Sequence, residues 1–201
     1  MDPVAQAVER AFEAMPRARF LPRGARWRAD HDGPIQIGQG QTSSQPRTVA
    51  AMLRLLDVRR GQRVLDVGAG SGWTTALLAH LTGPDGAVHG VELEPDLVAF
   101  GQPNLAQTDQ PWATIEAAHP DVLGLPDRAP YDRILVSAAP VSLPGELVEQ
   151  LADPGRMVIP VAETMVLVER SQGELAVTEH GFYRFVPLRP SRRVTPGRDR
   201  Q

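Results

Sequence analysis

The chain has 201 residues, of which 42% are hydrophobic, and its formal net charge at pH 7 is −3. This length and composition are typical of one globular domain, and the mildly acidic balance argues against a surface for nucleic acid. Cysteine is absent and all 21 basic residues counted as lysine or arginine are arginines, which excludes disulfides, thiolate catalysis, cysteine-based structural zinc and lysine Schiff bases.

The sequence also indicates a compartment. No uninterrupted apolar run approaches the roughly 20 residues that span a bilayer. The first residues, MDPVAQAVERAF, lack the basic-then-apolar order of a secretory signal. The histidines show no metal-ligand spacing such as H-E-x-x-H. We therefore expect a cytoplasmic protein with no metal, no membrane contact and no nucleic-acid partner.

Three segments are predicted ahead of the alternating strands and helices that begin at Arg63. Apolar residues at helical spacing predict a first helix over roughly Asp2–Ala14. A stretch rich in glycine, glutamine and proline follows from Pro16 to Pro46, and it is too long to be a mere connector, which makes it a candidate functional loop. A second helix is predicted over Thr48–Leu56.

From Arg63 onward, predicted strands alternate with predicted helices. The strands are RVLDV, AVHGVE, WATIEA and DRILVSA, followed by RMVIPV, TMVLVER, ELAVTEH and FYRFVPL. The helices are WTTALLAHL, PDLVAFGQPNLA and LPGELVEQL, and we expect the second of these to be interrupted near Gly101 and Pro103. This alternation predicts an α/β fold with a doubly wound parallel sheet. The last strands follow one another without helices, so an antiparallel carboxyl-terminal hairpin is expected.

We expect a single domain over residues 1–190. It would comprise an amino-terminal helix, loop and helix in residues 1–60 and an α/β core in residues 61–190. Residues 191–201 are expected to form a basic, solvated and flexible tail rather than a site for an acidic partner.

The strongest local signal is the glycine-rich turn in VLDVGAGSGWTTALLA. A strand that contains Asp66 leads into a turn made by Gly68, Gly70, Ser71 and Gly72, and a helix follows. Glycines let the backbone turn tightly and let a ligand approach without a Cβ in the way. The turn predicts a cofactor site.

The spacing of the turn distinguishes two kinds of cofactor. A dinucleotide fingerprint, G-x-G-x-x-G, would need glycine where this chain has Trp73. The pattern here is G-x-G-x-G with Asp66 two residues before it, as in class I methyltransferases. An acidic residue at that place can meet the ammonium of a methionine moiety, whereas it would repel a phosphate.

Glu92 closes the second core strand, 24 residues after Gly68. An acidic group at a spacing of about 20 residues meets ribose hydroxyls in such folds. One carboxylate can accept hydrogen bonds from both hydroxyls. Glu94 and Asp96 are alternatives by residue type, but they fall past the strand end, where acidic residues are common at helix starts.

The fourth core strand ends in SAAP at Ser137–Pro140. Nucleic-acid amino-methyltransferases carry N/D-P-P-Y/F at this place, where polar and aromatic groups hold an exocyclic amine. The small residues here argue against base methylation.

Several motifs together resemble the protein-L-isoaspartate O-methyltransferase family over nearly the whole length. FEAMPRARFLP is similar to the family's helix and P-R-x-x-F-x-P motif, and GPIQIGQGQTSSQPRTVAAML is similar to P-L-x-I-G-x-G-Q-T-I-S-Q-P-x-x-V-A-x-M. LPDRAPYDRILVSAAP, DPGRMVIPV and FYRFVPL match later segments in order.

The resemblance implies S-adenosyl-L-methionine as cofactor, with Asp66, Gly68, Gly70, Ser71, Gly72, Glu92 and Asp121 as its binding residues. It also implies transfer of the methyl group to a free carboxylate of isoaspartate or D-aspartate in a damaged protein or peptide. The family's hydroxyl beside that carboxylate falls on Ser44, with Thr42 two positions earlier. These two are the predicted catalytic residues, and a monomer is expected.

Two departures from the family pattern affect this interpretation. Ser43 replaces the isoleucine of T-I-S. Where the family has G-D-G, this chain has His119, Pro120 and Asp121, so the aspartate that meets the adenine amino group falls on Pro120. Either a local shift lets Asp121 serve, or adenine is held differently.

Three alternatives stay open at this point. The scaffold can serve a dedicated peptide, methylating an ordinary aspartate during natural-product maturation, or it can be a binding module without turnover. Ser44 can also act as the N-cap of the helix that begins at Pro46, alone or beside its catalytic role.

Overall fold

The computed structural model describes residues 2–189, so the predicted tail at residues 191–201 lies outside the described residues. The amino-terminal elements are, in order, α1 (Pro3–Ala14), the 3₁₀ helices η1 (Arg17–Phe20) and η2 (Arg23–Arg28), β1 (Ile35–Gly38), β2 (Gln41–Ser43) and α2 (Pro46–Leu56). The core elements are β3 (Arg63–Val67), α3 (Trp73–Thr82), β4 (Ala87–Glu92), α4 (Pro95–Ala106), β5 (Ala113–Ala117), η3 (Pro126–Arg128), β6 (Tyr131–Val136), α5 (Gly145–Glu149), β7 (Leu151–Val161), β8 (Thr164–Ser171) and β9 (Glu174–Phe182).

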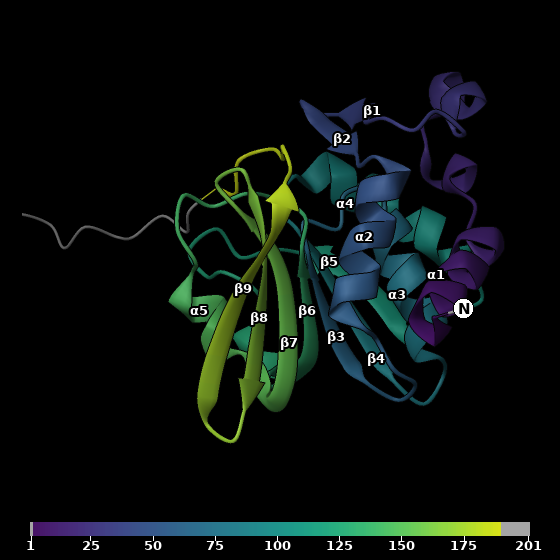
Figure 1. The fold of residues 1–201 in the computed structure, drawn as a ribbon. Coiled ribbons are helices and arrows are strands. Elements are labelled where there is room, and N and C mark those ends of the chain that lie inside the picture. Colours follow the sequence, from purple (N-terminus) through teal and green to yellow (C-terminus); the bar gives the residue numbers. More distant parts are fainter. Residues whose placement is uncertain (1, 190–201) are drawn as a thin grey trace, which may run out of the picture.

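The strands from β3 onward form one sheet in the order β5-β4-β3-β6-β7-β8-β9 (Figure 1). Strands β5, β4, β3, β6 and β7 pair in parallel, whereas β8 and β9 add antiparallel pairs. The predicted α/β class and the antiparallel carboxyl end are therefore confirmed. The strand order reverses direction between β3 and β6, and α/β folds bind ligands at such a switch point, beyond the carboxyl ends of the strands.

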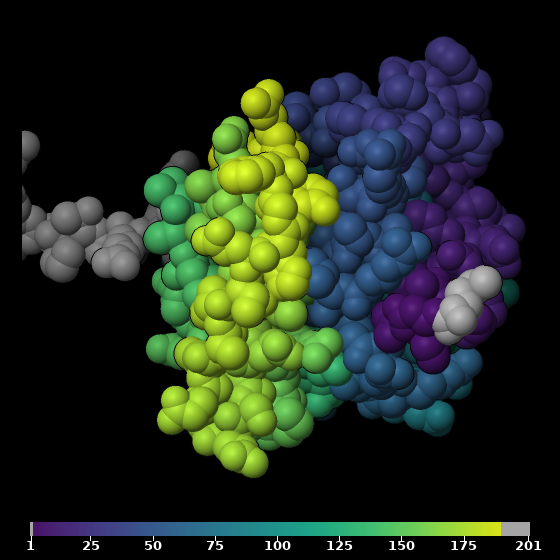
Figure 2. Space-filling model, viewed as in Figure 1, coloured from purple at the N-terminus to yellow at the C-terminus, as the bar shows by residue number. Residues whose placement is uncertain are grey.

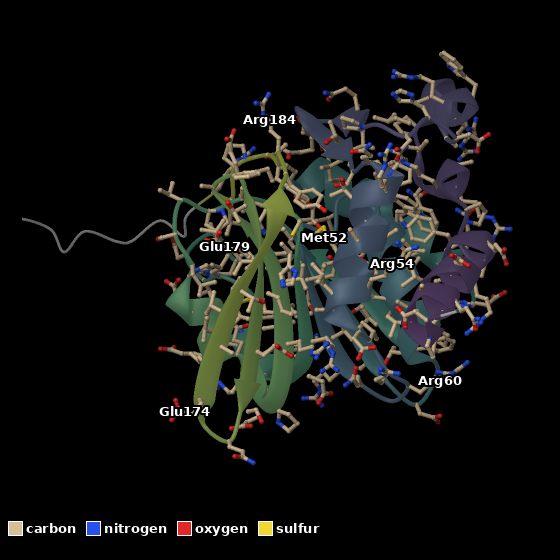
Figure 3. All side chains as sticks on the ribbon, in the orientation of Figure 1. Met52, Arg54, Arg60, Glu174, Glu179 and Arg184 are labelled. Atoms are coloured by element: carbon tan, nitrogen blue, oxygen red, sulfur yellow. The ribbon has the colours of Figure 1, made fainter. Side chains whose placement is uncertain are left out.

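Two hydrophobic clusters hold the layers together. The larger joins α1, α2 and α3 to one face of the sheet, and the other packs α5 against the opposite face (Figure 1). On α2, Met52 is buried and Arg54 is exposed, as expected of a helix with one apolar face (Figure 3). In the space-filling view the amino-terminal segments form one side of the molecule and the carboxyl-terminal strands form the other (Figure 2).

The expected interruption of α4 near Gly101 and Pro103 was wrong, because the helix is continuous from Pro95 to Ala106. Tertiary contacts hold it on both sides of the proline. Gln102 Nε2 donates to the carbonyl of Ile115 at 2.8 Å, and Asn104 Nδ2 donates to the carbonyl of Ser71 at 3.0 Å. These contacts offset the hydrogen bond that Pro103 cannot make.

The expected strand FYRFVPL was also wrong. Phe182 is the last residue of β9, where it pairs with Thr164 at the start of β8, so β8 offers no further residues for pairing. The chain instead crosses the end of the sheet, and Ala139 exchanges backbone hydrogen bonds with Val186 and Leu188 at 2.8 and 2.9 Å.

The long segment between Pro16 and Pro46 is not a structureless loop. It contains η1, η2 and the two-stranded β1–β2 hairpin. Ile35 and Ile37 of this hairpin pack with Leu21 and with Leu97 of α4, which places the hairpin beside the carboxyl ends of the core strands.

Candidate active site

A cavity lies where the carboxyl ends of β3, β4 and β6 meet the β1–β2 hairpin. It encloses about 1080 Å³ when its solvent-filled mouth is counted. Its walls include the turn after β3, the end of β4, the segment 118–124, the start of the segment after β6, and residues 186–189. A concave site lined by apolar and polar residues beyond the carboxyl ends of parallel strands is where such folds bind ligands and cofactors.

The turn after β3 is hydrogen-bonded to the carboxylate of Glu92. Gly70 N donates to Glu92 Oε2 at 2.8 Å, and Glu94 N donates to Oε1 at 2.9 Å. Each carboxylate oxygen keeps a free lone pair, so Glu92 can still accept hydrogen bonds from the cavity that it lines.

Gly68, Gly70 and Gly72 all have positive φ angles, which favour glycine. Gly68, Gly70 and Ser71 line the cavity. Gly72 does not: a Cβ at Gly72 would lie 3.2 Å from the carbonyl oxygen of Gly101, so this glycine permits close packing of the turn on α4.

Asp66 is fully buried beneath the turn and does not line the cavity. Its Oδ2 accepts hydrogen bonds from the hydroxyls of Thr74 and Thr75 at 2.8 and 2.7 Å, and its Oδ1 is buried without a partner in the described part of the chain. Burial raises the pKa of Asp66 to about 6, against the lowering effect of the two threonine hydroxyls. The unpartnered oxygen fits a nearby cationic group better than a neutral or anionic one.

The β1–β2 hairpin brings both predicted catalytic residues to the cavity. Thr42, Ser43 and Ser44 all line it, but Ser43 is buried and its hydroxyl accepts a hydrogen bond from Arg17 Nε at 3.0 Å. The alternative role of Ser44 as an N-cap was wrong: Gln45 occupies the N-cap position and makes no side-chain cap bond, and Asp32 Oδ1 accepts from Arg47 N instead.

The buried side chain of Arg17 holds the backbone of this segment. Its guanidinium donates to the carbonyl oxygens of His31, Gly33, Ser43 and Ser44 at distances between 2.9 and 3.0 Å. Burial lowers the pKa of Arg17 to about 10, so the side chain stays charged at neutral pH. Carbonyl dipoles, rather than a hydrogen-bonded carboxylate, surround this charge.

The model of the protein-L-isoaspartate(D-aspartate) O-methyltransferase family (PCMT) matches residues 3–193. A protein-L-isoaspartate O-methyltransferase of Methanopyrus kandleri is 44% identical over 186 residues, which cover 90% of this chain and 82% of the relative.

The chain belongs to the protein-L-isoaspartate(D-aspartate) O-methyltransferase family.

Two solved family structures have the same fold as this methyltransferase. One protein-L-isoaspartate O-methyltransferase superposes with a TM-score of 0.81 at 23% identity, covering 94% of this chain and 62% of the other. A second, from Plasmodium falciparum, was solved with S-adenosyl-L-homocysteine. It superposes with a TM-score of 0.76 at 26% identity, covering 91% of this chain and 90% of the other.

The methyltransferase cavity has a different lining near 119–121 from the one predicted. His119 and Pro120 line it, whereas Asp121 is exposed and does not. The backbone N–H of Asp121 donates to His119 Nδ1 at 3.1 Å, which turns the segment back on itself. The cofactor role of Asp121 stays a prediction.

Residues 186–189 form a wall of the cavity that sequence reasoning missed. Arg189 pairs with Glu94 at 2.5 Å across its edge. The only signal was the FYRFVPL motif, whose apolar alternation predicted a strand. Arg17 was missed as well, although it lies in the P-R-x-x-F motif, because nothing local shows which carbonyls a buried arginine will meet.

Two further observations concern residues 2–189. No helix in this range has both the length and the apolar character needed to cross a membrane. Nor do three or more histidine, aspartate or glutamate side chains in this range gather as potential metal ligands.

Asp66 gives a testable pH dependence of stability. Its native pKa of about 6 lies above the ordinary value of 3.8, so the native state retains the proton longer than the unfolded state. The stability that the Asp66 carboxyl contributes is fully present below pH 3.8 and is lost as pH rises toward about 6. We expect Asp66→Asn to remove this loss.

Urea unfolding without cofactor at pH 5 and pH 7.5 measures this effect. The free energy of unfolding of Asp66→Asn, relative to the unsubstituted chain, should increase by about 1 kcal/mol between the two pH values. If the difference in free energy of unfolding between the variant and the unsubstituted chain is the same at pH 5 and pH 7.5, Asp66 is already ionised at pH 5.

Proposed function

We propose that this chain transfers the methyl group of S-adenosyl-L-methionine to the free carboxylate of an L-isoaspartyl or D-aspartyl residue in a damaged protein or peptide. The observation that carries this proposal is the shared cavity: Glu92 reaches it from β4 and Ser44 reaches it from the hairpin. The relatives' activity, as their names state it, supports the same acceptor.

The residues of the cavity fit the cofactor. Gly68 and Gly70 line the cavity without a Cβ, and Glu92 offers acceptors to ribose hydroxyls. Asp66 does not line the cavity, so its unpartnered oxygen would favour the ligand's ammonium from beneath the turn. When bound, the cofactor supplies an electrophilic methyl group on a sulfonium. Ala118, Val122 and Leu123 offer an apolar surface for the adenine ring.

The chain's own residues then need to orient the acceptor and exclude water. A carboxylate has an ordinary pKa near 4, so it is already a nucleophile at neutral pH and needs no general base. The Ser44 hydroxyl can donate to one carboxylate oxygen and leave the other aimed at the methyl group. The apolar side chains of Val186 and Leu188 can exclude water from the same end of the cavity.

A pair of peptides tests the proposal. They are identical except for isoaspartate or aspartate at one position, and base-labile methyl esters are counted with labelled S-adenosyl-L-methionine. We expect label on the isoaspartyl peptide at ten times or more the level on its partner. Equal labelling of both, or labelling of the aspartyl peptide alone, would contradict the proposal and favour a dedicated peptide substrate.

A non-catalytic module would give a third result in the same assay. It would bind S-adenosyl-L-methionine, seen as a rise in the unfolding temperature, without labelling either peptide. The family membership favours turnover over this alternative. The cytoplasmic location, the monomeric state and the single domain over residues 1–190 stay predictions.

A further inference from the structure

The side chain of Arg17 donates hydrogen bonds to the backbone of the segment that carries Ser44. Among the residues that Arg17 contacts, Ser43 is the one that accepts twice, through its carbonyl and through its hydroxyl. Arg17 Nε donates to Ser43 Oγ at 3.0 Å, and Nη2 donates to Ser43 O at 2.9 Å. Both residues are nearly inaccessible to solvent, at 5% and 6% exposure.

The two bonds fix the guanidinium in two directions. A planar guanidinium has donors in a rigid fork, so a bond at Nε sets its rotation while the Nη donors reach the carbonyls. Without the Ser43 hydroxyl as acceptor at Nε, the guanidinium of Arg17 could rotate, and the carbonyl of Ser44 that it binds could move with it. Ser43 stands where the family motif has isoleucine, whose side chain offers no acceptor.

Arg17 also reaches the cofactor side of the cavity. Its guanidinium carbon lies 5.4 Å from the ring centroid of Trp73, the first residue of α3 after the glycine turn. Trp73 Nε1 in turn donates to the carbonyl of Met15 at 2.9 Å, which ties the ring to the end of α1. Arg17 thus contacts both the acceptor segment and the first residue after the cofactor turn.

We propose that Arg17 and Ser43 form a positioning pair that sets the place of Ser44 relative to the cofactor turn. This inference rests on the proposed function, because the position of Ser44 matters only if Ser44 holds the acceptor. The pair then explains why serine replaces the motif's isoleucine at position 43: the Ser43 hydroxyl supplies the acceptor that Arg17 Nε meets. An alignment error of about 1 Å can slow transfer by about 100-fold, so loosening this pair should lower turnover.

Two variants of equal shape test the hydroxyl of Ser43. Ser43→Thr keeps the acceptor and Ser43→Val replaces it with a methyl group, so any crowding is shared by both. We expect the kcat for the isoaspartyl peptide to be about tenfold lower in Ser43→Val than in Ser43→Thr. Cofactor affinity by calorimetry should agree within about twofold. Ser171→Ala, at the end of β8 away from the cavity, serves as a control.

Amide hydrogen exchange supplies a readout that does not depend on activity. Amides of residues 33–44 should exchange about fivefold faster in Ser43→Val than in Ser43→Thr, because the backbone carbonyls are held less firmly. If the unsubstituted chain fails to label the isoaspartyl peptide, the proposed function fails, and the exchange rates still decide whether the pair exists.

Combining Arg17→Lys with Ser43→Val tests whether the two act as one unit. Lysine keeps the charge but not the fork. If each single change lowers kcat about tenfold, the double variant should lose about 10- to 20-fold, because both remove the same constraint. A loss of about 100-fold would show independent effects, and equal kcat and exchange in the threonine and valine variants would overturn the pair outright.

Discussion

Glu92→Ala is expected to weaken the binding of S-adenosyl-L-methionine about 100-fold. Two hydrogen bonds from ribose hydroxyls to a carboxylate together stabilise the complex by about 3 kcal/mol, and each 1.4 kcal/mol is a tenfold change in affinity. The N–H groups of Gly70 and Glu94 also lose their acceptor, which loosens the turn. Isothermal calorimetry at pH 7.5 measures the dissociation constant.

A second ligand separates the ribose contact from the loosened turn. The 2′-deoxy analogue of S-adenosyl-L-homocysteine should bind the unsubstituted chain more weakly than S-adenosyl-L-homocysteine itself, and this difference should vanish in Glu92→Ala. If the difference persists in the variant, Glu92 acts through the turn alone. Glu149→Gln, an exposed carboxylate of α5, is the matched control and should bind both ligands normally.

Ser44→Ala should lower turnover on the isoaspartyl peptide by about 10- to 100-fold. The negative charge of the acceptor carboxylate falls as the methyl group arrives, so a hydrogen bond to it is not strengthened in the transition state. The value of the Ser44 hydroxyl therefore lies in the aim of the attacking oxygen. Steady-state kinetics with saturating cofactor measures kcat and KM for the peptide.

The cofactor dissociation constant should stay within about twofold in the same variant, because Ser44 directly follows β2 and is not on the turn after β3. Thr42→Val keeps the shape of the second lining hydroxyl residue and removes its hydroxyl, and it tests whether Thr42 shares the role. Unchanged kcat in Ser44→Ala together with a loss in Thr42→Val would transfer the holding role to Thr42.

Much of the fold was predictable because its signals are local. The period of apolar residues distinguishes strands from helices, and positive φ angles select the glycines of the turn after β3. The position of Glu92 followed from the same reasoning, since adjacent parallel strands end at one edge of the sheet. The antiparallel end followed from strands that succeed one another with no helix between them.

Other features depended on residues far apart in the chain. The continuity of α4 rests on Gln102 and Asn104, whose partners lie on β5 and in the turn after β3. Gly101 and Pro103 predicted a break, because the flexibility of glycine and the missing N–H of proline are local properties and the compensating contacts are not. The segment after β9 likewise has the alternation of a strand but no strand left to pair with.

By itself, the sequence determined the α/β class, the glycine turn, the acidic residue at the end of β4 and the resemblance that pointed to a carboxyl methyltransferase. Each depends on residue types at short spacing, where backbone geometry leaves few choices. Only the tertiary structure decided that the Ser43 hydroxyl meets Arg17, that Asp66 is buried outside the cavity lining, and that Arg17 donates to the carbonyls of Ser43 and Ser44. Those arrangements arise when packing brings distant segments together and leaves buried polar groups to find partners.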